Sequence, residues 1–546
     1  AASDVYKRQK LTLSLLLTAS LAAHAYEKDK TYHFTVLHSN DTHGRFWKND
    51  KGEYGFSVLK TAIDNVRKEV EAQGGTVILL HAGDFNTGVP ESDLQNAKPD
   101  IEGLNDMKFD ALALGNHEFD NPLQLLDKQE RWAKFPFLSA NVRYKNGKFL
   151  VKPYTIIQRG GLKFAVVGLT TEDTAKLGNP EYLGNVTFQP VIEAAREILP
   201  AVNKAKPDVR IALTHIGYYN DGKHGHNAPG DVTLARSLPA KSFDMIIGGH
   251  SHTPVCINED GSLKTPYVPN TPCQPDVQNG MPIMQAYEWG KFLGRADFEF
   301  KNGVTKLVRY QLIPANLKRK DGSFYTSEIP AEPKLLAKLQ KYQDLGDKKL
   351  NIKVGEATAA FDGTRELVRS QQMPIGQLIT RAQLERTQAD FSLMQGGGIR
   401  DTIPAGTITY KTVLKVQPFG NLLSVVPLTG KETFDYLQEI VFKDKGSGGY
   451  PHLAGVSLTY CPADKTIANV KIQGKPLNPT ATYRFVLPDY IAAGGDGYPV
   501  LKTHTGFTKT GFVDADTTKT YFGKHSPLNP ADYSPDGVLV EQCAAK

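Results

Sequence analysis

The sequence lacks the patterns that mark several large classes of protein. Beyond its first residues it has no run of about 20 apolar residues, so no segment is predicted to cross a membrane. It has no C-x-x-C pair, which argues against a zinc site built from thiolates, and no G-K-[ST] sequence, which excludes a P-loop. The formal net charge is only +6 for 546 residues and no basic run stands out, so binding to nucleic acid polymers is not expected.

The first 25 residues have the pattern of an export signal. A basic start is followed by a short apolar stretch over residues 11–17, and Ala23-His24-Ala25 fits the small-x-small cleavage pattern. We expect residues 1–25 to be a cleaved signal peptide, with residues 1–9 as a possible artefact, and the mature chain to begin near Tyr26. The expected location is therefore the periplasm.

The four cysteines are expected to form disulfides, because an exported protein meets an oxidising compartment. Three pairings are possible. We favour Cys256 with Cys273 and Cys461 with Cys543, because each pair then lies within one candidate domain.

The order of elements predicts an α/β fold with more than one domain. Strand-like apolar runs alternate with helical patterns over residues 32–300, and residues 333–351 read as a polar helix that begins at Pro333. This helix would either connect two domains or lie on the surface of one. Residues 352–546 mix helices, short strands and Gly-rich turns.

Five short segments rich in Asp, His and Asn each follow a predicted strand. They are Asp41-Thr42-His43, Gly83-Asp84, Gly115-Asn116-His117-Glu118, Thr214-His215 and Gly248-Gly249-His250-Ser251-His252. Each is weak alone, since a lone His or Asp is more often a cap or a satisfied polar residue. Carboxylate, amide and imidazole groups together suit zinc, manganese and related divalent ions, and Asp84 is the natural bridge between two ions.

The order of these segments resembles the calcineurin-like metallophosphoesterases. The sequences LHSNDTHG, HAGDFNTG, ALGNHEFD, GGHSH, GGGIRD, VQPFGN and GGDGYP are similar to the periplasmic 5'-nucleotidase/UDP-sugar hydrolase group of the 5'-nucleotidase family, over roughly residues 31–543. The resemblance implies a metallophosphoesterase domain over residues 26–332, a four-layer α/β sandwich. It also implies an interdomain linker helix over 333–351 and a mixed α/β substrate-binding domain over 352–546.

The resemblance further implies two divalent ions, with zinc as the expected metal and manganese or cobalt as alternatives. Seven residues would hold them: Asp41, His43, Asp84, Asn116, His215, His250 and His252. Some close relatives carry Gln at the position of His252. His117 and Asp120 would form the catalytic dyad, with Asp120 orienting the imidazole; the alternative is that His117 only orders Asn116.

The resemblance places the nucleotide on the second domain. Arg365, Arg369 and Arg400 would bind phosphate, and the rings of Phe419 and Tyr490 would stack on the base. Asn421 would read the base edge and Asp496 would accept the ribose hydroxyl groups. Close relatives carry Phe at Tyr490, so the hydroxyl group is a candidate for altering base preference.

We therefore expect hydrolysis of nucleoside 5'-phosphates and nucleotide-sugar pyrophosphates by attack of a metal-activated water on phosphorus. The alternatives are a 2',3'-cyclic-nucleotide 2'-phosphodiesterase with 3'-nucleotidase activity and, outside the enzymes, a periplasmic nucleotide-binding protein. Nucleotides and nucleotide sugars are the expected partners, and neither a membrane anchor nor more than a monomer is expected.

Overall fold

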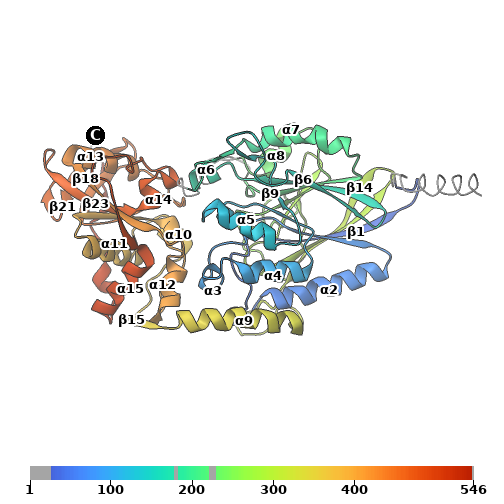
Figure 1. Ribbon diagram of the computed structural model, residues 1–546, viewed down its shortest axis with the longest axis horizontal. Coiled ribbons are helices and arrows are strands. Elements are labelled where there is room, and N and C mark those ends of the chain that lie inside the picture. The colour runs from blue at the N-terminus through green and yellow to red at the C-terminus, as the bar shows by residue number, and fades with distance from the viewer. Residues whose placement is uncertain (1–25, 178–181, 220–228, 544–546) are drawn as a thin grey trace, which may run out of the picture.

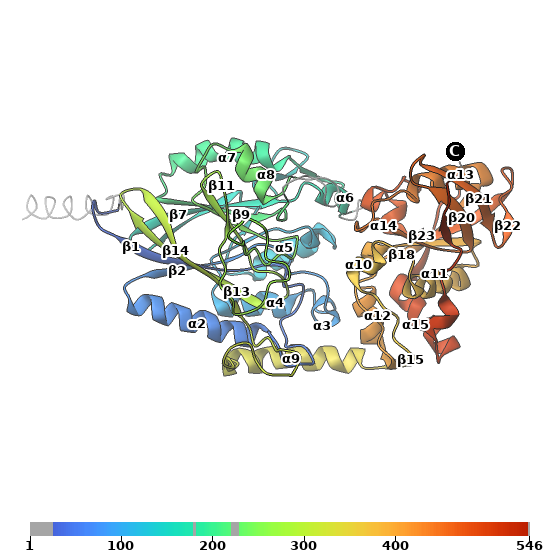
Figure 2. The same ribbon diagram turned by 180° about the vertical axis from the view of Figure 1, so that it is seen from behind.

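The computed structural model describes residues 26–177, 182–219 and 229–543. The predicted signal peptide, residues 1–25, lies outside the described residues. The chain forms two parts side by side along the long axis, and helix α9 (Pro333–Leu350) runs below the N-terminal part toward the second (Figures 1 and 2). The predicted α/β fold is confirmed.

Two six-stranded sheets form the centre of the N-terminal part. The strands of the first, in spatial order, are β14 (Val304–Pro314), β13 (Phe292–Lys301), β1 (Tyr32–Ser39), β2 (Thr76–His81), β3 (Ala111–Ala113) and β4 (Phe137–Leu138). Those of the second are β11 (Asp276–Gln278), β12 (Met281–Gln285), β10 (Met245–Gly248), β9 (Val209–His215), β7 (Leu162–Thr170) and β6 (Tyr154–Arg159).

Helices cover the outer faces of both sheets, which gives four layers. On one side α2 (Phe56–Ala72) packs on β1 and β2, with α4 (Lys98–Met107) and α5 (Leu123–Trp132) next in order; on the other, α7 (Val191–Lys204) and α8 (Asp231–Ser237) cover the second sheet (Figure 1). The buried residues of α2 include Leu59, Ile63, Val66 and Val70, the three-and-four spacing of one helical face. The central strands are buried on both sides and are therefore apolar almost throughout.

The parallel pairing of the central strands determines where the functional segments lie. Strand β1 pairs in parallel with β2, and β2 with β3, while β9 pairs in parallel with β7 and β10. The carboxyl ends of these strands therefore meet at one edge of the two sheets. Open α/β sheets bind ligands at that edge.

The C-terminal part has two main sheets. The larger has the order β19 (Pro451–Ala454), β16 (Phe391–Gln395), β23 (Thr482–Pro488), β18 (Leu422–Thr429) and β24 (Thr508–Val513). The smaller has β22 (Lys475–Pro476), β21 (Thr466–Ile472), β20 (Val456–Cys461) and β25 (Leu539–Glu541). The helices are α10 (Arg365–Val368), α11 (Pro374–Thr387), α12 (Tyr410–Val416), α13 (Gly430–Ile440), α14 (Asp489–Ala492) and α15 (Asp514–His525), and β15 (Lys353–Ala357) pairs with β17 (Gly406–Thr409).

Helix α9 begins at Pro333, and the Glu332 side chain caps it by accepting the N–H groups of Lys334 and Leu335. Its buried Leu335 and Leu339 belong to the core of the N-terminal part. The helix is thus packed on the first part and leads directly into β15. The short link between Leu350 and Lys353 is where the chain passes from one part to the other.

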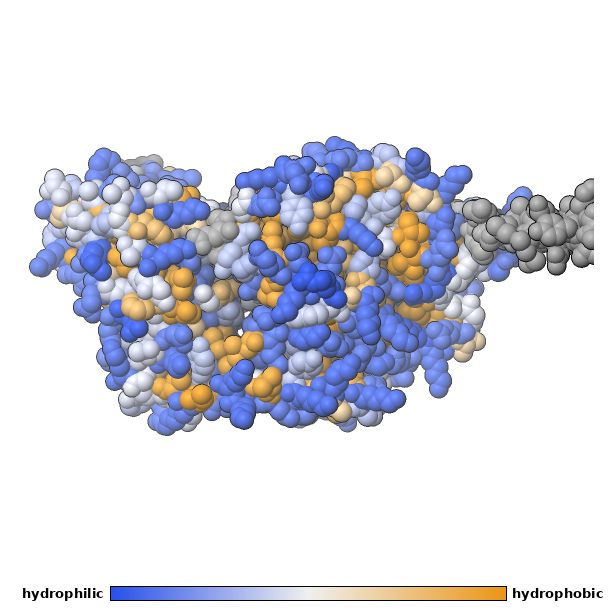
Figure 3. Space-filling view, viewed as in Figure 1, coloured by the Kyte–Doolittle hydropathy of each residue, from blue (hydrophilic) through white to orange (hydrophobic). Residues whose placement is uncertain are grey.

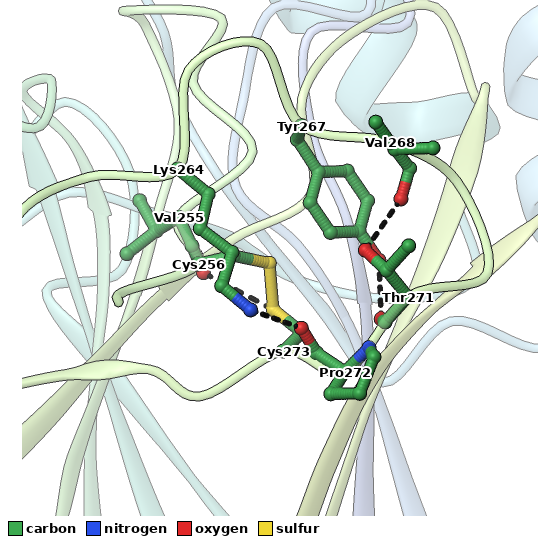
Figure 4. The surroundings of a disulfide bond; sticks show 8 residues. All are labelled: Val255, Cys256, Lys264, Tyr267, Val268, Thr271, Pro272 and Cys273. Carbon is green, nitrogen blue, oxygen red and sulfur yellow. Dashed lines mark hydrogen bonds between the residues drawn. A yellow bond between two sulfur atoms is a disulfide. The ribbon is translucent and has the colours of Figure 1, made fainter. Parts of the chain in front are cut away.

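The structure contains the two disulfides favoured from the sequence, Cys256–Cys273 and Cys461–Cys543. Figure 4 shows the first, next to a loop in which the Lys264 ammonium donates to the Pro272 carbonyl at 2.7 Å. The second links β20 to the segment after β25 and closes a separation of 82 residues.

Hydrophilic residues cover most of the face shown in Figure 3, and the surface is indented where the two parts meet. Among the described residues, no helix combines the length and apolar character needed to cross a bilayer.

Candidate metal centre and substrate cleft

The seven predicted metal ligands lie together at the shared edge of the two sheets. Asp41 and His43 follow β1, Asp84 follows β2, Asn116 follows β3, His215 ends β9, and His250 and His252 follow β10. Five of the seven are buried, whereas His250 and His252 are partly exposed, with 16% of the His252 side chain accessible.

Donor atoms of these residues form two overlapping groups. In one group, His252 Nε2 lies 3.1 Å from Asp41 Oδ1 and 3.2 Å from His43 Nε2. In the other, His215 Nε2 lies 2.9 Å from Asp84 Oδ2, and His250 Nδ1 lies 2.8 Å from Asn116 Oδ1.

Asp84 is close to both groups, since its Oδ2 is also 3.8 Å from His43 Nε2. Asp84 would therefore be placed to contact both ions if two were bound.

Hydrogen bonds at the far sides of three imidazole rings make these groups suited to cations. The Nδ1 atoms of His43 and His215 face carbonyl oxygens, of Thr87 at 2.9 Å and of Ala82 at 2.6 Å, and His252 Nδ1 faces Glu288 Oε2 at 2.7 Å. Because those oxygens only accept, each Nδ1 carries the proton and each Nε2 presents a lone pair inward. Lone pairs and carboxylates that converge in this way repel one another unless a cation lies among them, so the residues fit a divalent metal.

Two buried glutamates that the sequence analysis did not select hold this centre in place. Glu118 accepts the N–H groups of Asp84 and Gly115 at 2.9 and 2.7 Å, which fixes the two turns that carry metal ligands. Glu288 accepts from His252 and from Lys291 Nζ at 2.7 Å. Glu118 belongs to one of the sequence motifs given above. The residues around Glu288, in contrast, do not distinguish it from a solvent-exposed glutamate.

His117 and Asp120 form a close pair beside the centre. His117 Nδ1 lies 2.6 Å from Asp120 Oδ2, and the backbone N–H of His117 donates to Asp84 Oδ1 at 2.9 Å. Burial alone would lower the pKa of His117, but the carboxylates of Asp120 and Asp84 outweigh it and raise that pKa. His117 also lies within reach of His43 and Asp84, so the geometry alone does not separate it from the ligands.

Three arginines of the C-terminal part line a cleft that the candidate metal centre also lines. Arg365 begins α10, Arg369 directly follows it, and Arg400 follows the glycine turn after β16. Burial and the charge of Arg365 lower the pKa of Arg400 to about 10, and the same two causes lower the pKa of Arg369. Arg369 Nε is buried without a hydrogen-bond partner among the described residues. A bound anion would relieve both the repulsion and the missing hydrogen bond.

The predicted nucleotide residues line this cleft from the C-terminal part. Phe419 lies parallel to His117, with ring centroids 6.0 Å apart, so the aromatic side of the cleft directly faces the dyad. Asn421 is 8% exposed and its amide donates to Asp514 Oδ2 at 3.2 Å. Asp496 is 5% exposed, and its backbone N–H donates to the Tyr490 hydroxyl at 3.1 Å.

One cleft, about 300 Å³ in volume, is lined by residues of both parts. From the first part come Asp84, Asn116, His117, Asp120, His250 and His252, and from the second Arg365, Arg369, Arg400, Phe419, Asn421, Tyr490 and Asp496. The cleft thus joins the predicted metal centre to the predicted nucleotide site, while the role of each residue stays a prediction.

Among the polar residues of the lining, sequence reasoning missed Asp173, Tyr182, Tyr219, Gln395, Asp489 and Lys509. Tyr219 follows His215 closely and Asp489 precedes Tyr490, so proximity to a motif was the available signal for these two. Lys509 lies on β24 with no motif near it, and only the sheet order brings it to the cleft.

Two family matches fall one on each part of the fold. Residues 34–254 match the calcineurin-like phosphoesterases, and residues 353–503 match the 5'-nucleotidase C-terminal domain.

Similar proteins cover nearly the whole chain. Protein UshA of Escherichia coli K12 is 51% identical over 97% of this chain and 99% of its own length. A 5'-nucleotidase of Vibrio cholerae is 50% identical over 97% of this chain and 98% of its own length. The crystal structure of a 5'-nucleotidase precursor from Thermus thermophilus has a TM-score of 0.74 at 28% identity, and covers 94% of this chain and 100% of that one.

Proposed function

Because the chain belongs to the 5'-nucleotidase family of calcineurin-like phosphoesterases, we propose that it hydrolyses nucleoside 5'-phosphates and the pyrophosphate bond of nucleotide sugars. The chain is a metal-dependent phosphoester hydrolase that acts on nucleotides. The proposal adds the nucleotide-sugar substrates, zinc as the metal, and a periplasmic, monomeric protein. The observation that supports it is one cleft with clustered His and Asp side chains on one wall and three arginines on the other.

The proposed metal site uses the two groups of donors described above. One ion would be held by Asp41, His43, Asp84 and His252, and the other by Asp84, Asn116, His215 and His250. Bound divalent cations would supply positive charge against the phosphate and lower the pKa of a water molecule. The imidazole-rich donor set favours zinc over magnesium or calcium.

The protein's own residues would bind and orient the substrate. Arg365, Arg369 and Arg400 would grip phosphate oxygens through charge-assisted hydrogen bonds. Phe419 and Tyr490 would stack on the base, and Asp496 would accept hydrogen bonds from the ribose. Together they would place the phosphorus atom beside His117.

His117 would act on the reacting phosphate. Asp120 holds the Nδ1 side of the ring, which leaves Nε2 to donate a hydrogen bond to a phosphoryl oxygen or to the leaving oxygen of the nucleoside. Asp120 would therefore be a positioning residue. Its carboxylate would also stabilise the imidazolium form that carries the positive charge.

A substrate panel with metal removal tests the proposal. We expect purified residues 26–546 to hydrolyse AMP and UDP-glucose much faster than 2',3'-cyclic AMP. Chelation should abolish both activities, zinc should restore them, and elemental analysis should find about two ions per chain. Turnover that survives complete metal removal, or preferential hydrolysis of the cyclic nucleotide, would contradict the proposal.

A further inference from the structure

The hydroxyl group of Tyr490 is turned toward Asp496. It accepts the Asp496 backbone N–H at 3.1 Å, and a hydrogen bond between the hydroxyl and the Asp496 carboxylate also affects the pKa of both groups. Both residues line the cleft. Tyr490 therefore contacts the backbone and the side chain of the same aspartate.

Asp496 lies in a turn with a left-handed backbone conformation that its neighbours pack against. It lies in the Gly495–Gly497 turn with a φ of 53°, in the left-handed region that non-glycine residues rarely adopt. A Cβ atom at Gly495 would lie 2.4 Å from carbons of the Tyr490 ring, so the ring packs flat against the turn. Lys443 Nζ donates to the Gly497 carbonyl at 2.6 Å and holds the other side of the turn.

Asp496 is 5% exposed and lines the cleft on the side away from these supports. Gly448 lies beside the carboxylate, since a Cβ atom added there would be 3.4 Å from Asp496 Oδ1. Burial raises the pKa of Asp496 to about 6, against the opposing effects of Arg369 and of the Tyr490 hydrogen bond. Above that pH the group is an acceptor for hydroxyl hydrogens.

We propose that the Tyr490 hydroxyl makes the enzyme select ribonucleotides over 2'- and 3'-deoxyribonucleotides, by holding the Asp496 carboxylate where it accepts both ribose hydroxyl groups. This inference rests on the proposed function. Tyr490 acts in it as a positioning residue through its hydroxyl and as a stacking surface through its ring. When one hydroxyl group is missing from the substrate, a buried acceptor loses its partner, and this gives the selectivity.

The sequence alone had pointed to the base as the target of this hydroxyl group. The geometry favours the sugar, because the hydroxyl is engaged by Asp496, the residue expected to bind the ribose. An effect on the base would appear as a changed preference between AMP and UMP. An effect on the sugar would appear as a changed preference between AMP and its deoxy analogues.

The test compares Tyr490→Phe with a matched tyrosine. Tyr498 is 3% exposed and lies next to the same turn, but its hydroxyl donates to the Gly449 carbonyl at 2.7 Å rather than bonding to Asp496. For wild type, Y490F, Y498F and D496N, kcat and KM are measured with AMP, 2'-dAMP, 3'-dAMP and UMP. Binding of adenosine and 2'-deoxyadenosine to the metal-free proteins is measured by calorimetry.

We expect Y490F to lower kcat/KM for AMP about threefold to tenfold, mainly through KM, and to leave the values for the deoxy substrates within about twofold. Adenosine should lose affinity by a similar factor and 2'-deoxyadenosine should not. D496N should remove most of the selectivity, and Y498F should leave it unchanged.

Equal losses for AMP and its deoxy analogues in Y490F would overturn the proposal, as would a change confined to the ratio of AMP to UMP or unaltered selectivity in D496N. If wild-type protein with bound metal did not hydrolyse AMP, the proposed function would fail. The calorimetry of adenosine against 2'-deoxyadenosine would still decide the role of Tyr490.

Discussion

Five of the seven predicted metal ligands have a strained backbone. Asp41, His43, Asp84, His250 and His252 all have positive φ values, between 46° and 80°. Non-glycine residues adopt this region at a cost, and such residues cluster where function requires a particular direction of the side chain. Here these residues follow strand ends, and their donor atoms lie close together in the candidate metal centre.

At this scale, we expect that replacing His117 separates catalysis from metal binding. We expect His117→Ala to retain both metal ions and to lose about 10²- to 10⁴-fold in kcat, because it removes a proton donor and no ligand. Elemental analysis and steady-state kinetics check this. His33, whose side chain is 56% exposed, offers a control in His33→Ala, which should change neither quantity. Loss of one metal ion from His117→Ala would make His117 a ligand instead.

A buried carboxyl group away from the cleft predicts a pH effect on stability. Burial raises the pKa of Asp100 from 3.8 to about 8, with its Ser92 hydrogen bond opposing, Asp93 adding to the rise and Arg45 opposing it. The folded state therefore binds more protons than the unfolded state between about pH 4 and pH 8, and stability falls as pH rises through this window.

Asp100→Asn keeps the shape of the protonated group and cannot ionise. We expect the melting temperature of the variant, relative to wild type, to rise by several degrees between pH 5 and pH 8.5. Thermal unfolding followed by circular dichroism across this range measures the difference. A difference that is constant with pH would show that Asp100 does not titrate in the folded protein.

At the scale of elements, three helices, one of them α9, meet where the two parts of the protein touch. Glu91 of α3 (Pro90–Asp93) is 1% exposed and forms an ion pair with Lys411 of α12. Asp347 of α9 lies 3.4 Å from the same ammonium group, and Gln343 of α9 donates to Glu91 at 3.1 Å. These contacts link the first part, α9 and the second part through one buried carboxylate.

Removing the cation from this contact leaves Glu91 buried without its charge partner. We expect Lys411→Met to lower the free energy of unfolding by about 1–3 kcal/mol, a value reduced by the partial exposure of Lys411. Chemical denaturation measures it, and the double variant with Glu91→Gln should recover part of the loss.

The exposed pair of Lys431 and Asp435 in α13 supplies a control, because Lys431→Met should have no measurable effect. If Lys411→Met were as stable as wild type, the ion pair would not stabilise the contact between the parts.

At the scale of the whole molecule, the proposed metal centre and the proposed nucleotide site lie on opposite walls of one cleft. Metal binding and adenosine binding should therefore be lost in different variants. We expect Asp84→Asn to lose bound metal but to bind adenosine within about threefold of wild type. Phe419→Ala should keep both metal ions and bind adenosine at least about tenfold more weakly, since stacking on a base contributes about 1–3 kcal/mol.

Elemental analysis and calorimetry on the same preparations check this separation. Loss of both properties in either variant would mean that the walls of the cleft do not act independently. Because hydrolysis needs both walls around one substrate, each variant should also lose turnover of AMP.

The residues that could be found without coordinates are those in features set by the local sequence. The strand-end motifs identified Asp41, Asp84 and His250, because parallel strands must bring their carboxyl ends to one edge. Helix α9 was also predictable, since Pro333 fits its first turn and the pattern after it has helical spacing. These features are local, and local sequence chemistry determines them.

Other features depend on approach between distant segments, and only the tertiary structure decided them. Glu288 reaches His252 from 36 residues away, and Lys411 meets Glu91 across the two parts of the protein. The Tyr490 hydroxyl was visible in the sequence, but its partner was not, because the turn that directs Asp496 toward it is held by packing and by Lys443. The sequence alone determined the order of the strands along the chain and the donor residues that follow them. Both depend only on the residues within each short segment. The folded structure decided which wall of the cleft each residue faces and which partner each charged group has. Both depend on the distances between residues that are far apart in the sequence.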